Sequence, residues 1–154
     1  MRLLIVDDHP LMRSGIRQLV QQHWPDAAID EAPTLGEALA CIAAARPDLV
    51  TLDLSLPEAR GTDGVSRLLQ VLPGVPLLVL SLHAEPAYAA RLLQMGAAGY
   101  LTKDRAAEEL CAALRRLAEG GRYVTAAMAD QLQGLIGGPA PDAQPPGAAE
   151  RGAS

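Results

Sequence analysis

Acidic residues follow two apolar runs of this chain, and a lysine follows a third. Asp7 and Asp8 come directly after a run of Leu, Ile and Val, and Asp53 comes directly after a second such run. Lys103 stands two residues past the end of the third run. Runs of this kind, alternating with helical patterns, are typical of buried parallel strands, and ligands bind beyond the carboxyl ends of such strands. We therefore expect these four side chains to meet on one rim of a sheet.

The chemistry expected at this rim is that of a metal ion and a phosphoryl group. Carboxylates that lie close together repel one another unless a cation joins them. A hard divalent cation such as Mg²⁺ prefers oxygen ligands and leaves room for a phosphoryl oxygen. The residue types therefore predict a phosphoryl-transfer site that uses Mg²⁺, or at least a metal site.

Five strand–helix units are expected to position these residues. The expected strands are 2–7, 28–32, 48–53, 75–81 and 99–101. The expected helices are 11–22, 35–46, one from the end of the loop 54–64 to about residue 72, 85–95 and 106–119. This alternation predicts an α/β fold in which a doubly wound parallel sheet carries helices on both faces.

Local signals refine the two ends of this pattern. The first helix should bury the face formed by Leu11, Ile16, Leu19 and Val20. Thr34, with Glu37 three residues later, predicts a capping box at the second helix. After residue 121, Thr125 can cap a short helix that reaches about residue 136 and lines one side with Met128, Leu132 and Leu135. From residue 137 the composition of Gly, Pro and Ala predicts a flexible linker or tail.

Composition narrows the class of protein. A net charge of −5 gives no electrostatic footprint for nucleic acid, because DNA-binding domains are usually basic. Cys41 and Cys111 lie far apart in apolar helical patterns and are expected to be free thiols in a reducing compartment. The chain enters its first strand directly after Met-Arg, and no apolar stretch approaches about 18 residues. We therefore expect a cytoplasmic protein with no membrane segment.

Four motifs in order give the chain a family resemblance. They are Val6-Asp7-Asp8-His9-Pro10, Asp53-Leu54-Ser55-Leu56-Pro57, Ser81, and Lys103-Asp104. Together they resemble the receiver domain of bacterial two-component response regulators, and the first and last of them are most similar to the NarL/FixJ class. The resemblance implies a flavodoxin-like (βα)5 sheet with strand order 2-1-3-4-5. It covers residues 1–122 as the receiver, leaving 123–154 as a linker helix and tail.

The same resemblance implies a metal-dependent phosphoacceptor. Asp53 would receive the phosphoryl group, which is compatible with the competence of a carboxylate as a covalent nucleophile. Asp7 and Asp8 would hold Mg²⁺ together with Asp53 and the main-chain carbonyl of Ser55. Asp8 and Asp53 are expected to be the more direct ligands.

Three further residues are expected to bind and sense the phosphoryl group. The resemblance implies that Lys103 pairs first with Asp53 and then with the phosphoryl oxygens. Ser81 would donate its hydroxyl to the phosphoryl group. Tyr100 would be the aromatic side chain that moves inward when that hydroxyl is engaged. Charge neutralisation and positioning then supply most of the catalysis that phosphoryl transfer needs.

The expected function is a signalling switch that assists its own phosphorylation and dephosphorylation but is not an enzyme toward other substrates. A sensor histidine kinase would donate the phosphoryl group, and a homodimer is possible on phosphorylation. The NarL/FixJ class carries a helix-turn-helix domain after such a linker. The last ~18 residues are too short and too rich in Pro and Gly to form one. DNA binding by this chain alone is therefore not expected.

Two other functions compete with this interpretation. A Mg²⁺-dependent phosphohydrolase of the aspartyl-phosphate type would need a second acid/base Asp two residues after Asp53, where this chain has Ser55. A phosphate-independent interaction domain would have no need of the acidic residues and the lysine. Singly, each residue also has a structural alternative: Ser81 could cap the fourth helix, and Lys103 could be a surface charge.

Some neighbouring features carry less weight. His9 adjoins the acidic pair, but no second His or Cys stands at metal-ligand spacing, so a zinc site is not expected. His83 could overhang the phosphoryl group or be an exposed loop histidine. Gly61 stands at the family's usual turn glycine, while Gly64 leaves the start of the third helix open.

Overall fold

The computed structural model describes residues 1–59, 62–125, 128–129 and 131–132. The turn glycine expected at Gly61, the end of the helix expected near residue 136, and the tail lie outside these residues. Among the described residues, no helix has the length and apolar character needed to cross a membrane.

A single parallel sheet forms the centre of the molecule, as predicted. Its strands are β1 (Arg2–Val6), β2 (Ala28–Ala32), β3 (Leu49–Asp53), β4 (Leu77–Ser81), β5 (Gly99–Thr102) and β6 (Tyr123–Val124). They lie in the order β2-β1-β3-β4-β5-β6, and every neighbouring pair is parallel. The expected order 2-1-3-4-5 is therefore confirmed, and β6 adds an edge strand that was not expected.

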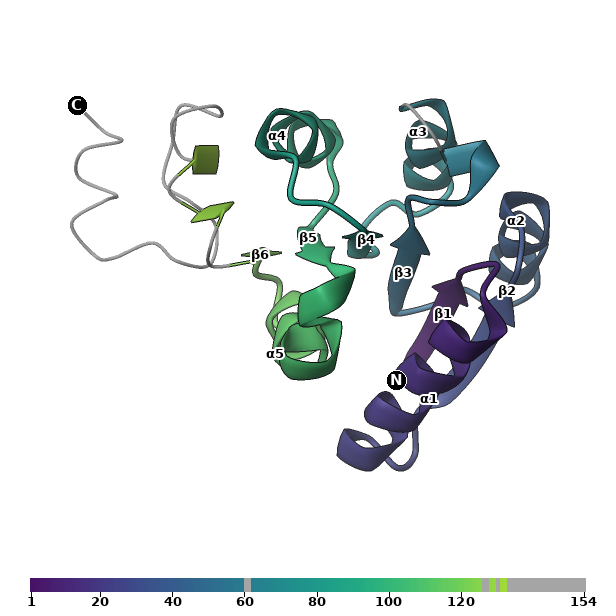
Figure 1. Ribbon diagram of the computed structural model, residues 1–154. Coiled ribbons are helices and arrows are strands. Elements are labelled where there is room, and N and C mark those ends of the chain that lie inside the picture. Colours follow the sequence, from purple (N-terminus) through teal and green to yellow (C-terminus); the bar gives the residue numbers. More distant parts are fainter. Residues whose placement is uncertain (60–61, 126–127, 130, 133–154) are drawn as a thin grey trace.

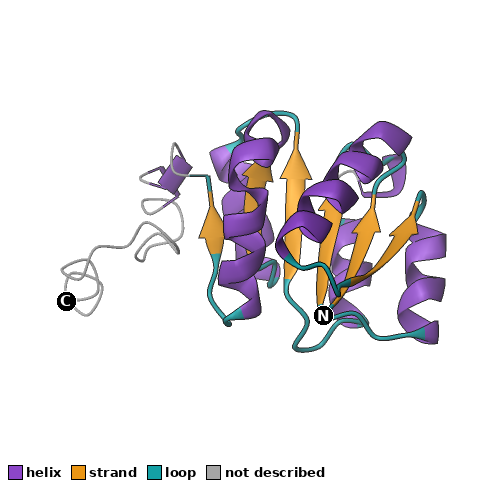
Figure 2. Cartoon of the chain, turned by 90° about the horizontal axis from the view of Figure 1, so that it is seen from below, coloured by secondary structure: helices purple, strands orange, loops and turns teal. Residues whose placement is uncertain are grey.

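Helices cover both faces of the sheet (Figures 1 and 2). The helices are α1 (Pro10–His23), α2 (Leu35–Ala44), α3 (Asp63–Gln70), α4 (Pro86–Met95) and α5 (Ala106–Ala118). Apolar residues of α1 and α5 pack on one face, and those of α2, α3 and α4 pack on the other. Two short 3₁₀ turns, η1 (Pro57–Ala59) and η2 (Lys103–Arg105), follow β3 and β5. Both stand at the carboxyl rim of the sheet.

Local details of the helices explain where the predictions held and failed. The prediction that Leu11 is buried is wrong, because 89% of this residue is exposed. Helical residues advance by about 100° each, so Leu11 stands about 140° from Ile16 and about 180° from Val20, on the outer side of α1. Ile16 and Val20, further along the helix, are buried as predicted. At α2 the cap is confirmed, because the Glu37 N–H donates to Thr34 Oγ1 at 3.1 Å.

Gly64 has a steric reason to be glycine. It lies in the first turn of α3, and a Cβ atom there would clash with the Glu58 carbonyl oxygen and the Ala59 Cα of η1. The close approach of η1 to α3 thus fixes the path of the loop that leaves the site after β3.

The segment after α5 packs onto the sheet. β6 pairs with β5 through Gly99 and Tyr100. Val124, Met128 and Leu132 are buried in the same apolar cluster as Tyr100 and the inner face of α4. Because the pair of strand residues in β6 is too short to show any periodicity, the sequence contained no signal for this strand.

Candidate functional site

The carboxyl ends of β1, β3 and β5 bring the predicted charged residues together. Val6 lies opposite Leu52 in the β1–β3 register, so Asp7 and Asp53 emerge side by side. Both aspartates are only 1% exposed, whereas Asp8 is exposed. Lys103 begins η2 directly after β5 and reaches Asp53.

Asp53 is held by a cation and by its own loop. Lys103 Nζ lies 2.8 Å from Asp53 Oδ1. The Ser55 N–H donates to the same oxygen at 2.9 Å, and the Ser55 hydroxyl donates to Oδ2 at 2.7 Å. Burial by itself would raise the pKa of Asp53, but the hydrogen bonds from Lys103 and Ser55 outweigh it and lower the pKa below its usual value. The carboxylate is therefore ionised at neutral pH.

Asp7 is in the opposite electrostatic situation. Its Oδ1 accepts the His9 N–H at 2.8 Å. Its Oδ2 is buried and finds no hydrogen-bond partner among the described residues. Burial raises the pKa of Asp7 despite the His9 N–H, and the neighbouring charge of Asp53 raises it further. A buried carboxylate oxygen without a partner is costly, and a bound cation would remove that cost.

His9 joins the three carboxylates. Its Nδ1 lies 3.0 Å from Asp8 Oδ1, 3.2 Å from Asp7 Oδ1 and 3.5 Å from Asp53 Oδ2. Ligand atoms of these four residues all lie within 4.8 Å of one another. The acidic pocket formed by Asp7, Asp8 and Asp53 could therefore bind a metal ion. The sequence placed His9 beside the acidic pair but assigned it no role, because no second His or Cys stands at metal-ligand spacing.

Ser81 and Tyr100 form a separate group of hydroxyls on the next two strands. The Ser81 hydroxyl donates to the His83 carbonyl at 3.0 Å, and the Tyr100 hydroxyl donates to the same carbonyl at 2.8 Å. Tyr100 is fully buried, and burial raises its pKa. Ser81 and Ser55 line one surface hollow. The hydroxyl of Ser81 thus stands beside the Asp53 loop but is engaged elsewhere.

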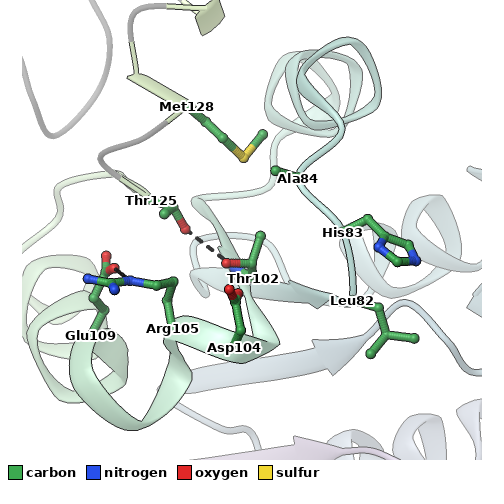
Figure 3. A pocket seen from close by; sticks show the side chains of 9 residues that line it. All are labelled: Leu82, His83, Ala84, Thr102, Asp104, Arg105, Glu109, Thr125 and Met128. Carbon is green, nitrogen blue, oxygen red and sulfur yellow. Dashed lines mark hydrogen bonds and ion pairs between the residues drawn. The ribbon is translucent and has the colours of Figure 1, made fainter.

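A second hollow lies behind this hydroxyl group, next to the segment after α5 (Figure 3). Thr125 approaches β5 there, and its Oγ1 accepts the Thr102 N–H at 3.4 Å. The hydroxyl that was expected to cap a helix is therefore engaged with β5. Opposite it, Arg105 Nε pairs with Glu109 at 2.7 Å. The hollow is lined by Leu82, His83, Ala84, Thr102, Asp104, Arg105, Glu109, Thr125 and Met128.

Each predicted site residue can now be located. Asp7, Asp8, Asp53 and Lys103 come together, as the strand-end argument requires. Ser55 contacts Asp53 through its N–H and hydroxyl, and the role of its carbonyl as a ligand stays a prediction. Ser81 and Tyr100 are neighbours of this cluster, but in this structure they bond to the His83 carbonyl.

The parallel sheet with helices on both faces and an acidic rim has the flavodoxin-like architecture of receiver domains, a class of signalling domains. The sequence profile of the response regulator receiver domain matches residues 3–115. The chain therefore belongs to the response regulator receiver domain family.

Comparison with individual proteins agrees with this assignment. The chain is 37% identical over 134 residues to the methanol utilization control regulatory protein MoxX of Paracoccus denitrificans, covering 86% of this chain and 60% of that protein. It is 30% identical over 123 residues to the transcriptional regulatory protein DegU of Brevibacillus brevis, covering 80% of this chain and 52% of that protein. The chain thus spans about half to three fifths of the length of these curated relatives.

A solved structure extends the likeness to three dimensions. The crystal structure of a LuxR-family two-component response regulator from Aurantimonas sp. SI85-9A1 matches with a TM-score of 0.78 and 31% sequence identity. The match covers 86% of this chain and 95% of that chain. The likeness in fold therefore extends over most of the chain.

Proposed function

We propose that this chain is a phosphoacceptor switch that takes a phosphoryl group onto Asp53 from a sensor histidine kinase. The observation that carries the proposal is the buried, ionised carboxylate of Asp53 paired with Lys103 Nζ at 2.8 Å. An ionised carboxylate is a competent nucleophile toward phosphorus. An oxygen of Asp53 bonds to phosphorus, the phosphorus–nitrogen bond of the donor histidine breaks, and the donor imidazole takes up a proton.

The proposed metal is Mg²⁺, held by the carboxylates of Asp7, Asp8 and Asp53 and by the main-chain carbonyl of Ser55. The donor set of three carboxylates and the unpartnered buried oxygen of Asp7 support this fit. When bound, the cation would neutralise charge on the phosphoryl oxygens. Asp53 then supplies the nucleophile, and Lys103 exchanges its contact with Asp53 for one with the new phosphoryl group.

The proposed signal is an exchange of partners at the His83 carbonyl. In this structure that carbonyl accepts from both Ser81 and Tyr100. We propose that the Ser81 hydroxyl leaves it to donate to the phosphoryl group. Tyr100 already lies in the buried position, so its hydroxyl remains as the donor to His83. The loop between β4 and α4 would then settle in a new position, and the equilibrium at the face of α4 and β5 would shift.

The chain is a signalling domain, and we propose that it assists its own phosphorylation and dephosphorylation without acting on other substrates. The arrangement of Ser55 supports this over a phosphohydrolase. The Ser55 hydroxyl donates a hydrogen bond to Asp53 Oδ2 at 2.7 Å, and a serine hydroxyl cannot replace the acid/base aspartate of a phosphohydrolase. A phosphate-independent interaction domain is disfavoured because the buried Asp7 oxygen and the Asp53–Lys103 pair cost stability without serving that role.

For the whole protein we propose a cytoplasmic transcriptional regulator. Similarity to a named transcriptional regulator supports this, with DNA bound through a domain that is not part of these residues and with a homodimer forming on phosphorylation. We keep residue 122 as the proposed end of the receiver and 123–154 as a linker helix and tail. The described part of that linker, however, packs against the receiver core.

Intact-mass measurement after incubation with phosphoramidate and Mg²⁺ tests the proposal. Wild-type protein should gain one phosphoryl group, and Asp53→Asn should gain none. Asp26→Asn, an exposed aspartate in the turn before β2, is the matched control and should be phosphorylated like wild type. Chelation of divalent cations should abolish the reaction in wild type. An undiminished adduct in Asp53→Asn would refute the assignment, and continuous release of phosphate in excess of the protein would favour the phosphohydrolase.

A further inference from the structure

We propose that His9 is itself a ligand of the metal at this site, through Nδ1, and that it moves the metal preference of this receiver from Mg²⁺ toward divalent transition ions. The inference rests on the metal site of the proposed function and deepens it. Three carboxylates alone would favour the harder cation Mg²⁺. The inference is that His9 changes which ion the site prefers.

The positions of the donor atoms support ligation. His9 Nδ1 lies 3.0, 3.2 and 3.5 Å from oxygens of Asp8, Asp7 and Asp53 respectively. An imidazole nitrogen carries at most one proton and can donate it to only one of these oxygens. Adjacent ligands of an octahedral ion with bonds of about 2.1 Å stand about 3 Å apart. The distances from Nδ1 to the three carboxylate oxygens are therefore close to those expected between ligands of one ion.

An independent observation concerns Asp7. Its Oδ2 is buried, has no hydrogen-bond partner among the described residues, and belongs to a side chain that is 1% exposed. His9 cannot satisfy this oxygen, since its backbone N–H and its ring nitrogen both face Oδ1 of the same carboxylate. A cation would be the missing partner of this carboxylate, and one ligand atom from each of Asp7, Asp8, His9 and Asp53 lies within 4.8 Å of the others, so the imidazole is within reach of the same ion.

The backbone at His9 is restricted by the proline that follows it. His9 is the residue before α1, with extended backbone angles of φ −97° and ψ 110°, and Pro10 follows it as the first residue of the helix. Proline restricts the residue before it to this region. The side chain of His9 is 60% exposed, so Nε2 can carry its proton toward solvent while Nδ1 keeps a lone pair for a metal.

The chemistry of the ligand set predicts the selectivity. Mg²⁺ prefers oxygen ligands and water, so exchanging one water for an imidazole gains it little. Imidazole suits transition ions, and affinity for a mixed nitrogen and oxygen site rises from Mn²⁺ to Ni²⁺. His9 should therefore contribute little to the affinity for Mg²⁺, more to that for Mn²⁺ and most to that for Ni²⁺.

Calorimetric titration of the full chain with Mg²⁺, Mn²⁺ and Ni²⁺ tests this order. His9→Ala should lower the affinity for Ni²⁺ by roughly 10- to 100-fold, the range seen when support of a metal ligand is lost, and the affinity for Mg²⁺ by less than about twofold. His23→Ala is the matched control. His23 Nδ1 lies 3.3 Å from Cys111 Sγ, so this variant also identifies any Ni²⁺ bound by that pair.

A spectroscopic measurement shows whether His9 bonds directly to the metal or only positions another ligand. Pulsed electron paramagnetic resonance of bound Mn²⁺ should detect a directly bonded histidine nitrogen in wild type and in His23→Ala, and none in His9→Ala. Equal losses for all three ions in His9→Ala, or a nitrogen signal that survives the substitution, would overturn the inference. A gain in affinity for every ion would also overturn it, since the imidazole would then block the site.

The variant Asp8→Asn shows whether a negative result concerns only His9 or the whole metal site of the proposed function. If Asp8→Asn lowers the affinity for all three ions while His9→Ala changes none, the metal site stands and only the role of His9 is wrong. If Asp8→Asn leaves every affinity unchanged, the metal site of the proposed function is wrong as well.

Discussion

The rim of the sheet has two halves that are built from different interactions. The charged half, at β1 and β3, consists of Asp7, Asp8, His9, Asp53 and the side chain of Lys103. The hydroxyl half, at β4, β5 and β6, consists of Ser81, Tyr100, Thr102 and Thr125. The charged half holds the Asp53–Lys103 ion pair at 2.8 Å and a buried Asp7 oxygen that has no hydrogen-bond partner within the described part of the chain. The hydroxyl half holds neutral hydrogen bonds, two of them on the single His83 carbonyl.

The two halves of the rim are therefore suited to different roles. In the charged half, a new cation or phosphoryl group changes both the attraction and the repulsion between charges. These energies are large because the carboxylates are removed from water. In the hydroxyl half, each neutral hydrogen bond contributes only about 1 kcal/mol to the free energy of unfolding. The first half can therefore receive the phosphoryl group, and the second can change its contacts in response at little cost.

The comparison predicts its largest effect at Lys103, which is the single lysine of the chain. Lys103→Met leaves the Asp53 carboxylate, 0% exposed, without its cation. Removal of one partner of a buried ion pair costs about 3–5 kcal/mol, so the free energy of unfolding should fall by this amount in metal-free protein at neutral pH. Urea denaturation measures it. Arg91→Met, at an exposed position of α4, is the matched control and should change it by less than about 0.5 kcal/mol.

A double variant sharpens this first test. Asp53→Asn together with Lys103→Met removes both charges, so it should recover a large part of the loss. A single Lys103→Met variant that loses less than about 1 kcal/mol would mean that water compensates Asp53, and the two halves of the rim would then be energetically alike.

The second effect concerns the apolar support of the hydroxyl half. Leu132 is fully buried in the cluster that contains Tyr100 and Met128. Leu132→Ala should lower the free energy of unfolding by about 2–5 kcal/mol, as truncation of a buried leucine does. Leu82→Ala, at a residue that is 61% exposed, should have almost no effect and serves as the control. Equally small losses in both variants would show that the segment after α5 does not support Tyr100.

The two halves also differ in how far the sequence could predict them. Asp7, Asp53 and Lys103 could be placed because the carboxyl ends of parallel strands meet on one rim, whichever strands are neighbours. The packing of Leu132 on the receiver could not be predicted, because β6 has only two residues and pairs with β5 through a register that no local pattern encodes. The parallel sheet with helices on both faces followed from the alternation of apolar runs and helical patterns, whereas its strand order was implied by the family resemblance.

The individual errors have separate physical origins. Successive helical residues turn by about 100°, so Leu11 stands about 140° from Ile16 and does not share its buried face. Spacing along the chain places His9 beside the acidic pair, but it does not encode the side-chain torsions that bring Nδ1 to 3.0 Å from Asp8. Periodicity and spacing thus define which residues are neighbours along an element, and packing decides what they contact.

A third prediction also concerns the charged half, but here the substitution should raise the free energy of unfolding. Burial raises the pKa of Asp7, so ionisation of Asp7 opposes folding. Asp7→Asn should therefore raise the free energy of unfolding of metal-free protein at neutral pH by about 1–3 kcal/mol, the cost of a buried unsatisfied group. Since a raised folded pKa makes stability fall as pH rises through it, the gain should vanish below the usual pKa of aspartate. Denaturation at several pH values measures this, and saturating Mg²⁺ should reverse the gain. A loss of stability in metal-free Asp7→Asn would contradict the assignment.

The smallest effect tests how far the charged half extends toward the edge strand β2. Arg13 donates to the Asp7 carbonyl at 2.6 Å and pairs with Glu31 at 2.9 Å, and Arg17 also pairs with Glu31 at 2.7 Å. Burial by itself would raise the pKa of Glu31, but the hydrogen bonds from the two arginines lower it below its usual value.

Glu31→Gln should therefore cost only about 0.2–1 kcal/mol at neutral pH, because these pairs are partly exposed to solvent. A lowered folded pKa contributes stability above the usual pKa of glutamate, and this contribution is lost as pH falls through the lowered pKa. The difference between wild type and Glu31→Gln should accordingly shrink in acid and in high salt, while the affinity for divalent cations stays unchanged. A parallel fall in metal affinity would show that Arg13 transmits the charge of Glu31 to Asp7. The charged half would then reach from β3 to the edge of the sheet, and the boundary drawn here between the metal site and the ion pairs of β2 would have no energetic meaning.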